Sequence, residues 1–398
     1  MSNKNTMIKV LYNLPPKSLI RFKLVSKDWS NLIGNSDFVS KNILNESIVN
    51  SDVQSQDANP RFILIKTRES IDPPKQLYSF HSFETLKCSY QTSLHLPLPE
   101  TSSYQKLDIV ACCRGLICLY DFSEKREIYV WNPIEPTPEH LPSFVIPYVE
   151  VINIEVHCVA FGVDPQTDEL KILRVIRGDD TFCMNAYQAV ELFSLHSRSW
   201  KQLNRESDVM FSGILDNKDT QAYLEGFSFW YADATEDNAE RIVRFDFSKE
   251  TFQTTLLPDE TVIGCASNRR HILKALNKSL SLVVLKDWNK DPYFEIWVLL
   301  EFEVRASWTK LFKIDCSNDI RILLGFWKNA KIFLDKKGEL VLFDPLTKSI
   351  ESVHPGQISK ELELVQCSVP KEYVELTKVW WLIILLLTIQ EFWITEVW

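Results

Sequence analysis

Glycine is scarce in this chain: only 10 of its 398 residues are glycine, and the glycine-dependent signatures of common enzymes are missing. The sequence contains no G-x-G-x-x-G, no P-loop and no G-x-S-x-G. It therefore lacks the loops that bind nucleotide phosphates and the turn that presents a serine nucleophile. A low glycine content is also unusual for a fold with many tight turns, because glycine adopts the positive φ of such turns most readily.

The ionisable residues form no recognisable catalytic or metal-binding set. None of the seven histidines has a partner at metal-ligand or triad spacing. Asp164 with Asp168, and Asp179 with Asp180, are carboxylate pairs. Such pairs are typical of turns and solvated loops, and we favour that interpretation over acid–base chemistry. We expect no catalytic residue, no metal ion and no cofactor, so the chain is predicted not to be an enzyme.

Cysteine usage points to a reducing compartment. The nine cysteines are odd in number and include no C-x-x-C pair, and the closest group is Cys112, Cys113 and Cys118. This pattern fits buried thiols rather than disulfides or a zinc site. The first residues, MSNKNTMIKV, contain no apolar core of signal-peptide length. We expect a cytoplasmic protein, with the nucleus as a second location.

Basic residues are also fewer than acidic residues. The formal net charge is −9 and the pI is near 5.4, with no basic block that would override this balance. An acidic chain has no electrostatic reason to bind nucleic acid, so we expect no such partner. A basic protein partner would suit it better, because complementary charge speeds encounter.

What the sequence does contain begins with a helical pattern from Leu14 to Phe38. Pro15 and Pro16 end any helix that precedes them, and Ser18 occupies an N-cap or first-turn position of the next helix. Gly34 closes the unit, as a C-terminal cap would. Residues at spacings of three and four share one helical face, whereas Arg21, Lys23 and Lys27 fall on other faces. The shared face consists of Leu19, Phe22, Val25 and Trp29.

This stretch resembles the F-box of plant F-box proteins, in the form LPxKSLxRFKxVSKxWxxLI. The resemblance implies a three-helix module that docks on a Skp-family adaptor and, through it, on a cullin. The implied role is substrate recognition in an SCF-type cullin-RING ubiquitin ligase. The alternative is an ordinary helical hairpin, and Phe22 and Trp29 could equally be structural. The predicted adaptor-facing or module-core residues are Leu11, Leu14, Pro15, Leu19, Val25 and Trp29.

The module departs from the family pattern at its start. The family usually opens with LPxD, but the equivalent positions here are Ser2 to Asn5. The apolar part of the first helix remains as Met7, Ile8, Val10 and Leu11. Losing one buried apolar anchor would weaken adaptor binding by about 1.5–3 kcal/mol. The sequence therefore leaves open a second function, a target-binding protein uncoupled from the ligase.

After a polar linker at residues 46–60, the chain becomes a series of short strand-like runs. Five similar phrases recur, and their aromatic markers are spaced by 62, 52, 52 and 46 residues. A period near 50 is typical of kelch-like propeller blades, which cover each other's faces by stacking. The number of blades is left open. The markers are Trp131, Phe193, Phe245, Trp297 and Phe343.

The same phrases resemble the F-box-associated domain of plant F-box proteins, especially the S-locus type. Examples are FGVDPQTDELKILRVI at 161–176 and FEIWVLLEFEVRASW at 294–308. The implied fold is a small all-α F-box module followed by a large all-β domain, a kelch-like β-propeller whose loops bind a target protein. The S-locus resemblance implies a basic self-incompatibility ribonuclease as the target. No target-binding residue can be named from the sequence.

The predicted boundaries are 1–45 for the F-box module, 46–60 for the linker, 61–370 for the β domain and 371–398 for an apolar tail. The uninterrupted apolar run within the tail is shorter than the approximately 20 residues that a spanning helix needs. Three interpretations stay open for the tail: an element packed on the β domain, an exposed segment, or a membrane anchor. The anchor is the least favoured, so we do not expect a membrane partner.

Overall fold

Runs rich in β-branched and aromatic residues form the strands of the computed structural model. Lys27 lies in an α-helix, and the other described elements are strands. The structure describes Lys27 and residues 61–68, 76–93, 107–121, 127–132, 138–142, 151–180, 186–203, 221–232, 240–258, 271–276, 278–287, 290–302, 307–316, 320–328, 331–353 and 363–368. Within these residues, the strands form six four-stranded antiparallel sheets. The predicted all-β character of the large domain is confirmed.

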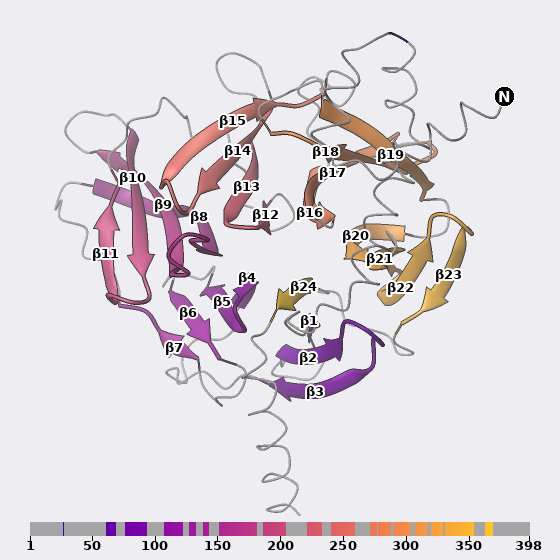
Figure 1. Ribbon diagram of the computed structural model, residues 1–398, viewed down its shortest axis with the longest axis horizontal. Helices are drawn as coiled ribbons and strands as arrows, with labels where there is room; N and C mark the ends of the chain where they lie inside the picture. The colour runs from indigo at the N-terminus through magenta and orange to yellow at the C-terminus, as the bar shows by residue number, and fades with distance from the viewer. Residues whose placement is uncertain are drawn as a thin grey trace, which may run out of the picture. The chain divides into compact units, whose positions relative to one another are not determined.

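The strands belong to two compact units, and each unit is described by itself. The first unit contains four sheets formed by consecutive strands (Figure 1). Their bounds are β8 (Val151–Val163), β9 (Leu170–Asp180), β10 (Ala186–Ser194) and β11 (Ser199–Gln202); β12 (Gln221–Leu224), β13 (Phe227–Ala232), β14 (Arg241–Asp246) and β15 (Thr251–Leu256); β16 (His271–Leu276), β17 (Ser279–Lys286), β18 (Tyr293–Leu299) and β19 (Trp308–Asp315); and β20 (Ile320–Trp327), β21 (Lys331–Lys336), β22 (Glu339–Asp344) and β23 (Ser349–Ser352).

The second unit contains two sheets. One has the order β24–β1–β2–β3, so a strand from near the end of the chain completes a sheet that the chain begins. In that sheet Leu64 pairs with Val365. The other sheet has the order β4–β5–β6–β7. The bounds are β1 (Arg61–Arg68), β2 (Gln76–Ser82), β3 (Cys88–Ser93), β24 (Glu363–Ser368), β4 (Leu107–Cys113), β5 (Leu116–Asp121), β6 (Ile128–Trp131) and β7 (Glu139–His140).

The five aromatic markers of the repeat occupy matching places. Each lies on the third strand of a different sheet. Trp131, which is 1% exposed, contacts Tyr78 and Phe80 across the two sheets of its unit, with ring centroids 5.4 and 5.9 Å apart. Phe245 and Trp297 likewise belong to apolar clusters that join neighbouring sheets. The predicted period is therefore the repeat of one four-stranded sheet.

One turn recurs at the ends of these strands and explains how the chain manages with few glycines. Asp164, Asp246 and Asp344 each accept hydrogen bonds at Oδ1 from the backbone N–H groups two and three residues later, at 2.9–3.4 Å. The fourth residue after each aspartate donates its N–H back to the aspartate carbonyl at 2.7–2.8 Å. That residue has φ between 56° and 60° in all three turns, although none is glycine. The aspartate side chain stabilises the turn where glycine would otherwise be favoured.

Three described glycines lie in hairpins that need two successive residues with positive φ. Arg114–Gly115, Glu225–Gly226 and Lys337–Gly338 connect adjacent strands, with φ of 45–52° at the first residue and 81–88° at the second. These are the angles of a type I′ turn. In the longer turns at Asp164, Asp246 and Asp344, side-chain capping takes the place of glycine.

Candidate functional site

The predicted adaptor-binding residues lie outside the described part of the chain. These are Leu11, Leu14, Pro15, Leu19, Val25 and Trp29. The described residue of this segment, Lys27, is helical and exposed, as the face assignment from the sequence requires. An extensive side-chain network among the described residues instead joins two sheets of the β domain.

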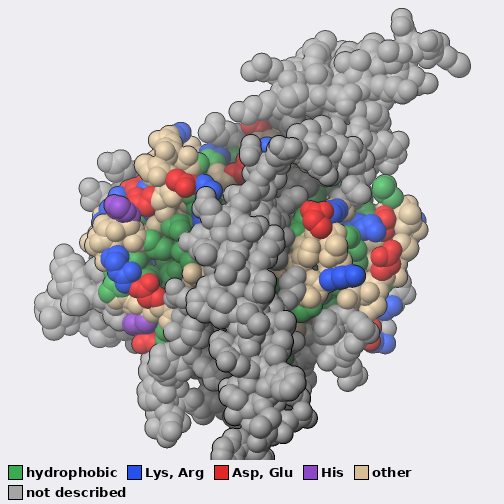
Figure 2. Space-filling model, turned by 60° about the horizontal axis from the view of Figure 1, so that its bottom comes forward, with side chains coloured by type: hydrophobic (Ala, Val, Ile, Leu, Met, Phe, Trp, Pro, Cys, Tyr) green, Lys and Arg blue, Asp and Glu red, His purple; other side chains and the backbone are tan. Residues whose placement is uncertain are grey.

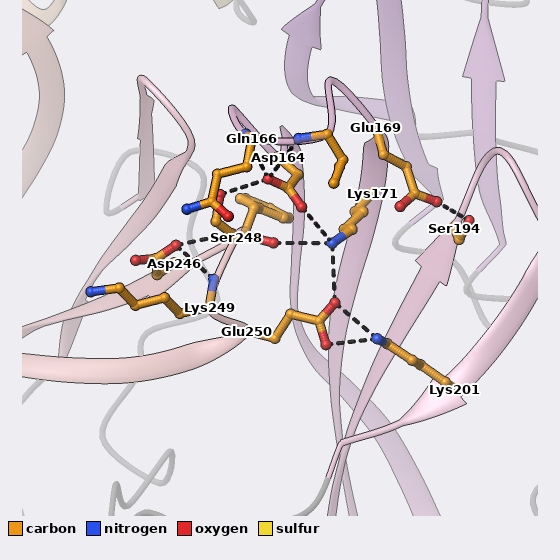
Figure 3. Close-up of polar contacts among 12 residues, drawn as sticks. Asp164, Gln166, Glu169, Lys171, Ser194, Lys201, Asp246, Ser248, Lys249 and Glu250 are labelled. Atoms are coloured by element: carbon orange, nitrogen blue, oxygen red, sulfur yellow. Dashed lines mark hydrogen bonds and ion pairs between the residues drawn. The ribbon is translucent and has the colours of Figure 1, made fainter.

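This network, which we call the inter-sheet clamp, consists of Asp164, Lys171, Lys201, Ser248 and Glu250 (Figure 3). Asp164 follows β8, Lys171 lies on β9 and Lys201 on β11, whereas Ser248 and Glu250 lie in the turn between β14 and β15. The clamp therefore connects the sheet β8–β11 to the sheet β12–β15. Both sheets belong to the same compact unit.

Lys171 is the centre of the clamp. Its ammonium group donates to Asp164 Oδ2 at 3.0 Å, to Glu250 Oε1 at 3.0 Å and to the Phe247 carbonyl at 3.2 Å. These three acceptors use all the donors of the amine. Lys171 is only 6% exposed, so its charge is removed from water and depends on these partners.

The carboxylates complete the clamp. Asp164 also accepts from the Ser248 hydroxyl at 2.6 Å, so one side chain both caps its own turn and contacts the neighbouring sheet. Glu250 accepts from Lys201 at 2.6 and 2.8 Å. Glu250 is also the positive-φ residue of its turn, with φ of 56°. The two turns are thus held in one arrangement by charge-assisted hydrogen bonds.

The pKa values of three clamp residues are shifted in favour of their charged forms. Burial by itself would raise the pKa of Asp164, but hydrogen bonds from Ser248, the Gln166 N–H and Lys171 hold that pKa far below its ordinary value. Burial opposes the charge of Glu250 as well, yet its lysine partners lower its pKa. Burial would lower the pKa of Lys171, and its two carboxylate partners raise it instead. All three groups are therefore charged at neutral pH, which suits a structural clamp and not proton transfer.

Close backbone packing accompanies the clamp. Gly162 lies so near the neighbouring sheet that a Cβ would be 2.3 Å from Phe247 Cε2 and 2.7 Å from Tyr223 Cε2. The Tyr223 hydroxyl accepts hydrogen bonds from the Val163 N–H at 3.1 Å and the Gly226 N–H at 3.2 Å. The turn ends of the two sheets are therefore closely packed and joined by hydrogen bonds.

The two carboxylate pairs singled out in the sequence have different structural roles. Asp164 caps a turn and Asp168 is exposed with φ of 60°, as the turn interpretation predicts. Asp179 and Asp180 instead end strand β9, where they pair with Ile152 and Val151. The prediction that this second pair lies in a loop is wrong, because β8 is long enough for β9 to pair with it up to Asp180.

Buried cysteines are poorly suited to nucleophilic chemistry. Six cysteines whose side chains are described are free thiols, and five of them are buried. Burial raises the pKa of Cys118 beyond its ordinary range and that of Cys316 to about 11. The thiol form, which is the weak nucleophile, therefore dominates at neutral pH. Within the described residues, no group of three or more His, Cys, Asp and Glu side chains could hold a metal ion.

The described surface is mixed in charge. On the face seen in Figure 2, Lys and Arg side chains alternate with Asp and Glu side chains and form no broad region of one sign. Of the described helices, none is long and apolar enough to cross a membrane.

Two protein-family models match the chain. The F-box domain model matches residues 5–41, and the model of the F-box associated beta propeller domain matches residues 74–375. The second match covers most of the chain. This chain belongs to the F-box-associated β-propeller family. The six four-stranded sheets are accordingly the blades of a six-bladed propeller, preceded by an F-box domain.

Curated relatives of this F-box protein come from Arabidopsis thaliana. F-box/kelch-repeat protein At3g23880 is 24% identical over 88% of this chain and 92% of the relative. Putative F-box protein At3g10430 is 24% identical over 71% of this chain and 70% of the relative. F-box protein CPR1 is 23% identical over 89% of this chain and 85% of the relative. The three matches cover 71–89% of this chain and 70–92% of the relatives.

Sequence reasoning identified the blades and missed the clamp. Lys171 lies 79 residues from Glu250, and no spacing rule connects them. The available signal was a lysine at the third position of a buried run, ELKILRVI, directly after a capped turn. A lysine in such a position needs a buried partner, and the turn aspartate seven residues earlier provides one.

Proposed function

We propose that this chain is the substrate-recognition subunit of an SCF-type cullin-RING ubiquitin ligase. The F-box module would dock on a Skp-family adaptor and, through it, on a cullin, while the propeller binds a target protein. The observation that carries the proposal is the order of the two matched domains, an F-box at residues 5–41 followed by a propeller at residues 74–375. Proteins with this F-box are typically non-catalytic adaptors of ubiquitin ligases.

The adaptor-binding proposal concerns six residues of the F-box match. They are Leu11, Leu14, Pro15, Leu19, Val25 and Trp29. Their apolar character at helical spacing supports a hydrophobic docking face. Lys27 lies within the same match, and its exposed position on a helix supports the assignment of charged residues to another face.

The propeller suits the task of positioning a target. In the unit that carries the clamp, the first and second strands of the sheet β8–β11, and the third and fourth strands of the sheet β12–β15, are joined by the short capped turns Asp164–Asp168 and Asp246–Glu250. Connections between successive sheets leave from the opposite ends of the strands and include residues 204–220 and 259–270. Longer connections tolerate sequence change, so we assign target recognition to that edge. A rigid scaffold then raises the effective concentration of target lysines near the conjugating enzyme.

A basic self-incompatibility ribonuclease is our proposed target class. The net charge of −9 supports a basic partner, and the S-locus-type phrases of the sequence support that subfamily. We place the encounter in the cytoplasm, with the nucleus as a second compartment, because the described cysteines are free thiols. Electrostatic steering predicts that the association rate falls as salt rises.

A second function is a target-binding propeller that is uncoupled from the ligase. The observation that favours it is the absence of the opening LPxD, whose positions hold Ser2 to Asn5. Co-purification of the full chain with a plant Skp-family adaptor and a cullin distinguishes the two functions. Recovery of the three-protein complex supports the ligase subunit. A folded chain that retains its target but recovers no adaptor supports the uncoupled protein.

A further inference from the structure

An exposed leucine distinguishes the turn between β22 and β23 from the two other aspartate-capped turns described above. Asp344 caps this turn with the same hydrogen bonds as the aspartates of the other two. Two positions after the aspartate, the other turns carry the polar residues Gln166 and Ser248, whereas this turn carries Leu346. Leu346 is 63% exposed, the more exposed of two large hydrophobic residues at the described surface. The geometry of the turn therefore does not require a leucine here.

The charge of the same turn is reversed as well. Four positions after the capping aspartate, at the residue with positive φ, the other turns carry Asp168 and Glu250. The turn at Asp344 carries Lys348, which is exposed and has φ of 57°. Within the described part of the chain, Lys348 forms no ion pair. Its ammonium group therefore remains available to a partner.

The turn between β20 and β21 adds an aromatic ring and further positive charge. β20 ends at Trp327, which pairs with Lys331 at the start of β21. Lys331 Nζ is 3.9 Å from Asp344 Oδ2, so this turn lies beside the turn that carries Leu346. Lys328 Nζ lies 5.7 Å from the centre of the half-buried Trp327 ring. The aromatic ring, the leucine and the lysines thus belong to adjacent turns of one sheet.

Positive charge exceeds negative charge in these two turns. Their sequences, WKNAK at 327–331 and DPLTKS at 344–349, contain three lysines and one aspartate. Lys331 is balanced by Asp344 and by Glu351, whose Oε1 is 4.0 Å from its ammonium group. The excess positive charge belongs to the other two lysines, in a chain whose formal net charge is −9.

We propose that these two turns bind a carboxylate-rich peptide segment of a partner protein. The binding surface, which we call the cationic rim, consists of Trp327, Lys328, Leu346 and Lys348. Charge complementarity selects an acidic segment. Leu346 and Trp327 provide apolar surface that a hydrophobic residue of the segment covers. Because Asp344 already fixes the turn, binding orders little backbone of this chain.

A phosphate backbone fits the cationic rim less well. The net charge of −9 opposes a polyanion over the rest of the surface, and phosphates and sugars would leave Leu346 uncovered. The capped turns also lie at the opposite ends of the strands from the connections to which we assign target recognition. The acidic segment and the target therefore do not compete for one surface.

Selection of a phage-displayed library of random short peptides against the full chain tests the proposal. Enriched peptides should carry several Asp and Glu residues around at least one apolar residue. Fluorescence polarisation with the synthetic form of an enriched peptide then measures its affinity for the full chain. This affinity should fall as salt concentration rises, because the lysines of the rim are at the surface.

The variant Leu346→Gln/Lys348→Glu removes both distinguishing features of the rim. The equivalent turns already hold Gln166 and Glu250 at these positions, so the fold should be retained. The variant should weaken peptide binding by about tenfold or more. Lys249→Glu is the matched control, because it changes the net charge as much as Lys348→Glu does, at an exposed lysine of an equivalent turn. It should bind the peptide like the unaltered chain.

Several results would overturn the proposal. One is the absence of enriched peptides, or the enrichment of peptides without acidic residues. Another is equal affinity of the double variant and the unaltered chain, which would place the binding surface elsewhere. An equal loss in Lys249→Glu would show a general charge effect and no defined surface. A single-stranded oligonucleotide that displaces the peptide at lower concentration than unlabelled peptide does would assign the rim to a phosphate backbone.

Discussion

Replacing Lys171 with methionine should destabilise the propeller by about 3 kcal/mol. Methionine retains much of the apolar stem and removes the charge, so the packing changes little. The ammonium group loses its bonds to Asp164, Glu250 and the Phe247 carbonyl. Breaking a buried ion pair from one side typically costs about 3–5 kcal/mol because a buried charge is left without its partner.

The lower end of that range follows from the bonds that remain. Asp164 Oδ1 still accepts from Ser248 at 2.6 Å and from the Gln166 N–H at 2.9 Å. Glu250 retains Lys201. Glu250 Oε1 loses Lys171 but still accepts from Lys201. The cost therefore arises mainly from Asp164 Oδ2, a carboxylate oxygen in a residue that is 3% exposed.

Urea unfolding followed by tryptophan fluorescence measures this effect as a shift of the midpoint at constant slope. Lys201→Met is the matched control: its side chain is 57% exposed, so it should cost less than about 1 kcal/mol. The double variant Asp164→Asn/Lys171→Met removes the unpaired charge, keeps an oxygen for the turn and should recover part of the loss. Equal costs for Lys171→Met and Lys201→Met would refute the view that Lys171 is the centre of the clamp.

The remaining predictions concern the pH dependence of the clamp, the close approach at Gly162 and the turn at Glu225. The lowered pKa of Asp164 contributes to the free energy of unfolding; this contribution is fully present above the unfolded pKa near 3.9 and is lost as pH falls below it. In urea titrations at a series of pH values, Lys171→Met should shift this loss of stability to higher pH. Gly162→Ala should cost about 1–3 kcal/mol in the same assay, because its Cβ would meet Phe247 at 2.3 Å, and Phe247→Leu should relieve part of that cost. Glu225→Asn should raise the free energy of unfolding by about 0.5–1 kcal/mol, because asparagine tolerates the φ of 45° better than glutamate does.

Each of these has a contradicting outcome. An acid transition unchanged by Lys171→Met would mean that the lysine does not set the ionisation of Asp164. A neutral Gly162→Ala would show that the two sheets can separate slightly at the clamp. A destabilising Glu225→Asn would mean that the glutamate side chain makes a stabilising contact larger than the turn strain.

The repeat was predictable because it depends on local pattern. Trp131, Phe193 and Phe245 mark the third strand of successive blades, and short apolar runs that carry an aromatic residue before a turn make such strands visible in sequence. The long first step of 62 residues between Trp131 and Phe193 also has a physical reason. β8 and β9 have 13 and 11 residues, longer than the equivalent strands of the other blades.

What the sequence could not provide depends on distant contacts. The blade count was left open because β24 pairs with β1 from the other end of the domain, and ELVQCS has no marker of its own. The Lys171 clamp was missed for the same reason, since its partners come from two blades. The F-box residues and the apolar tail remain predictions, because both lie outside the described residues.

Calorimetric titration of the full chain with a plant Skp-family adaptor tests the ligase role most directly. We predict a dissociation constant in the micromolar range or tighter. The triple variant Leu14→Ala/Leu19→Ala/Trp29→Ala should lose this binding with the propeller still folded, and Lys27→Ala, at an exposed helical position, should retain it. Absence of binding by the unaltered, folded chain would contradict the ligase role and favour a target-binding propeller without a ligase.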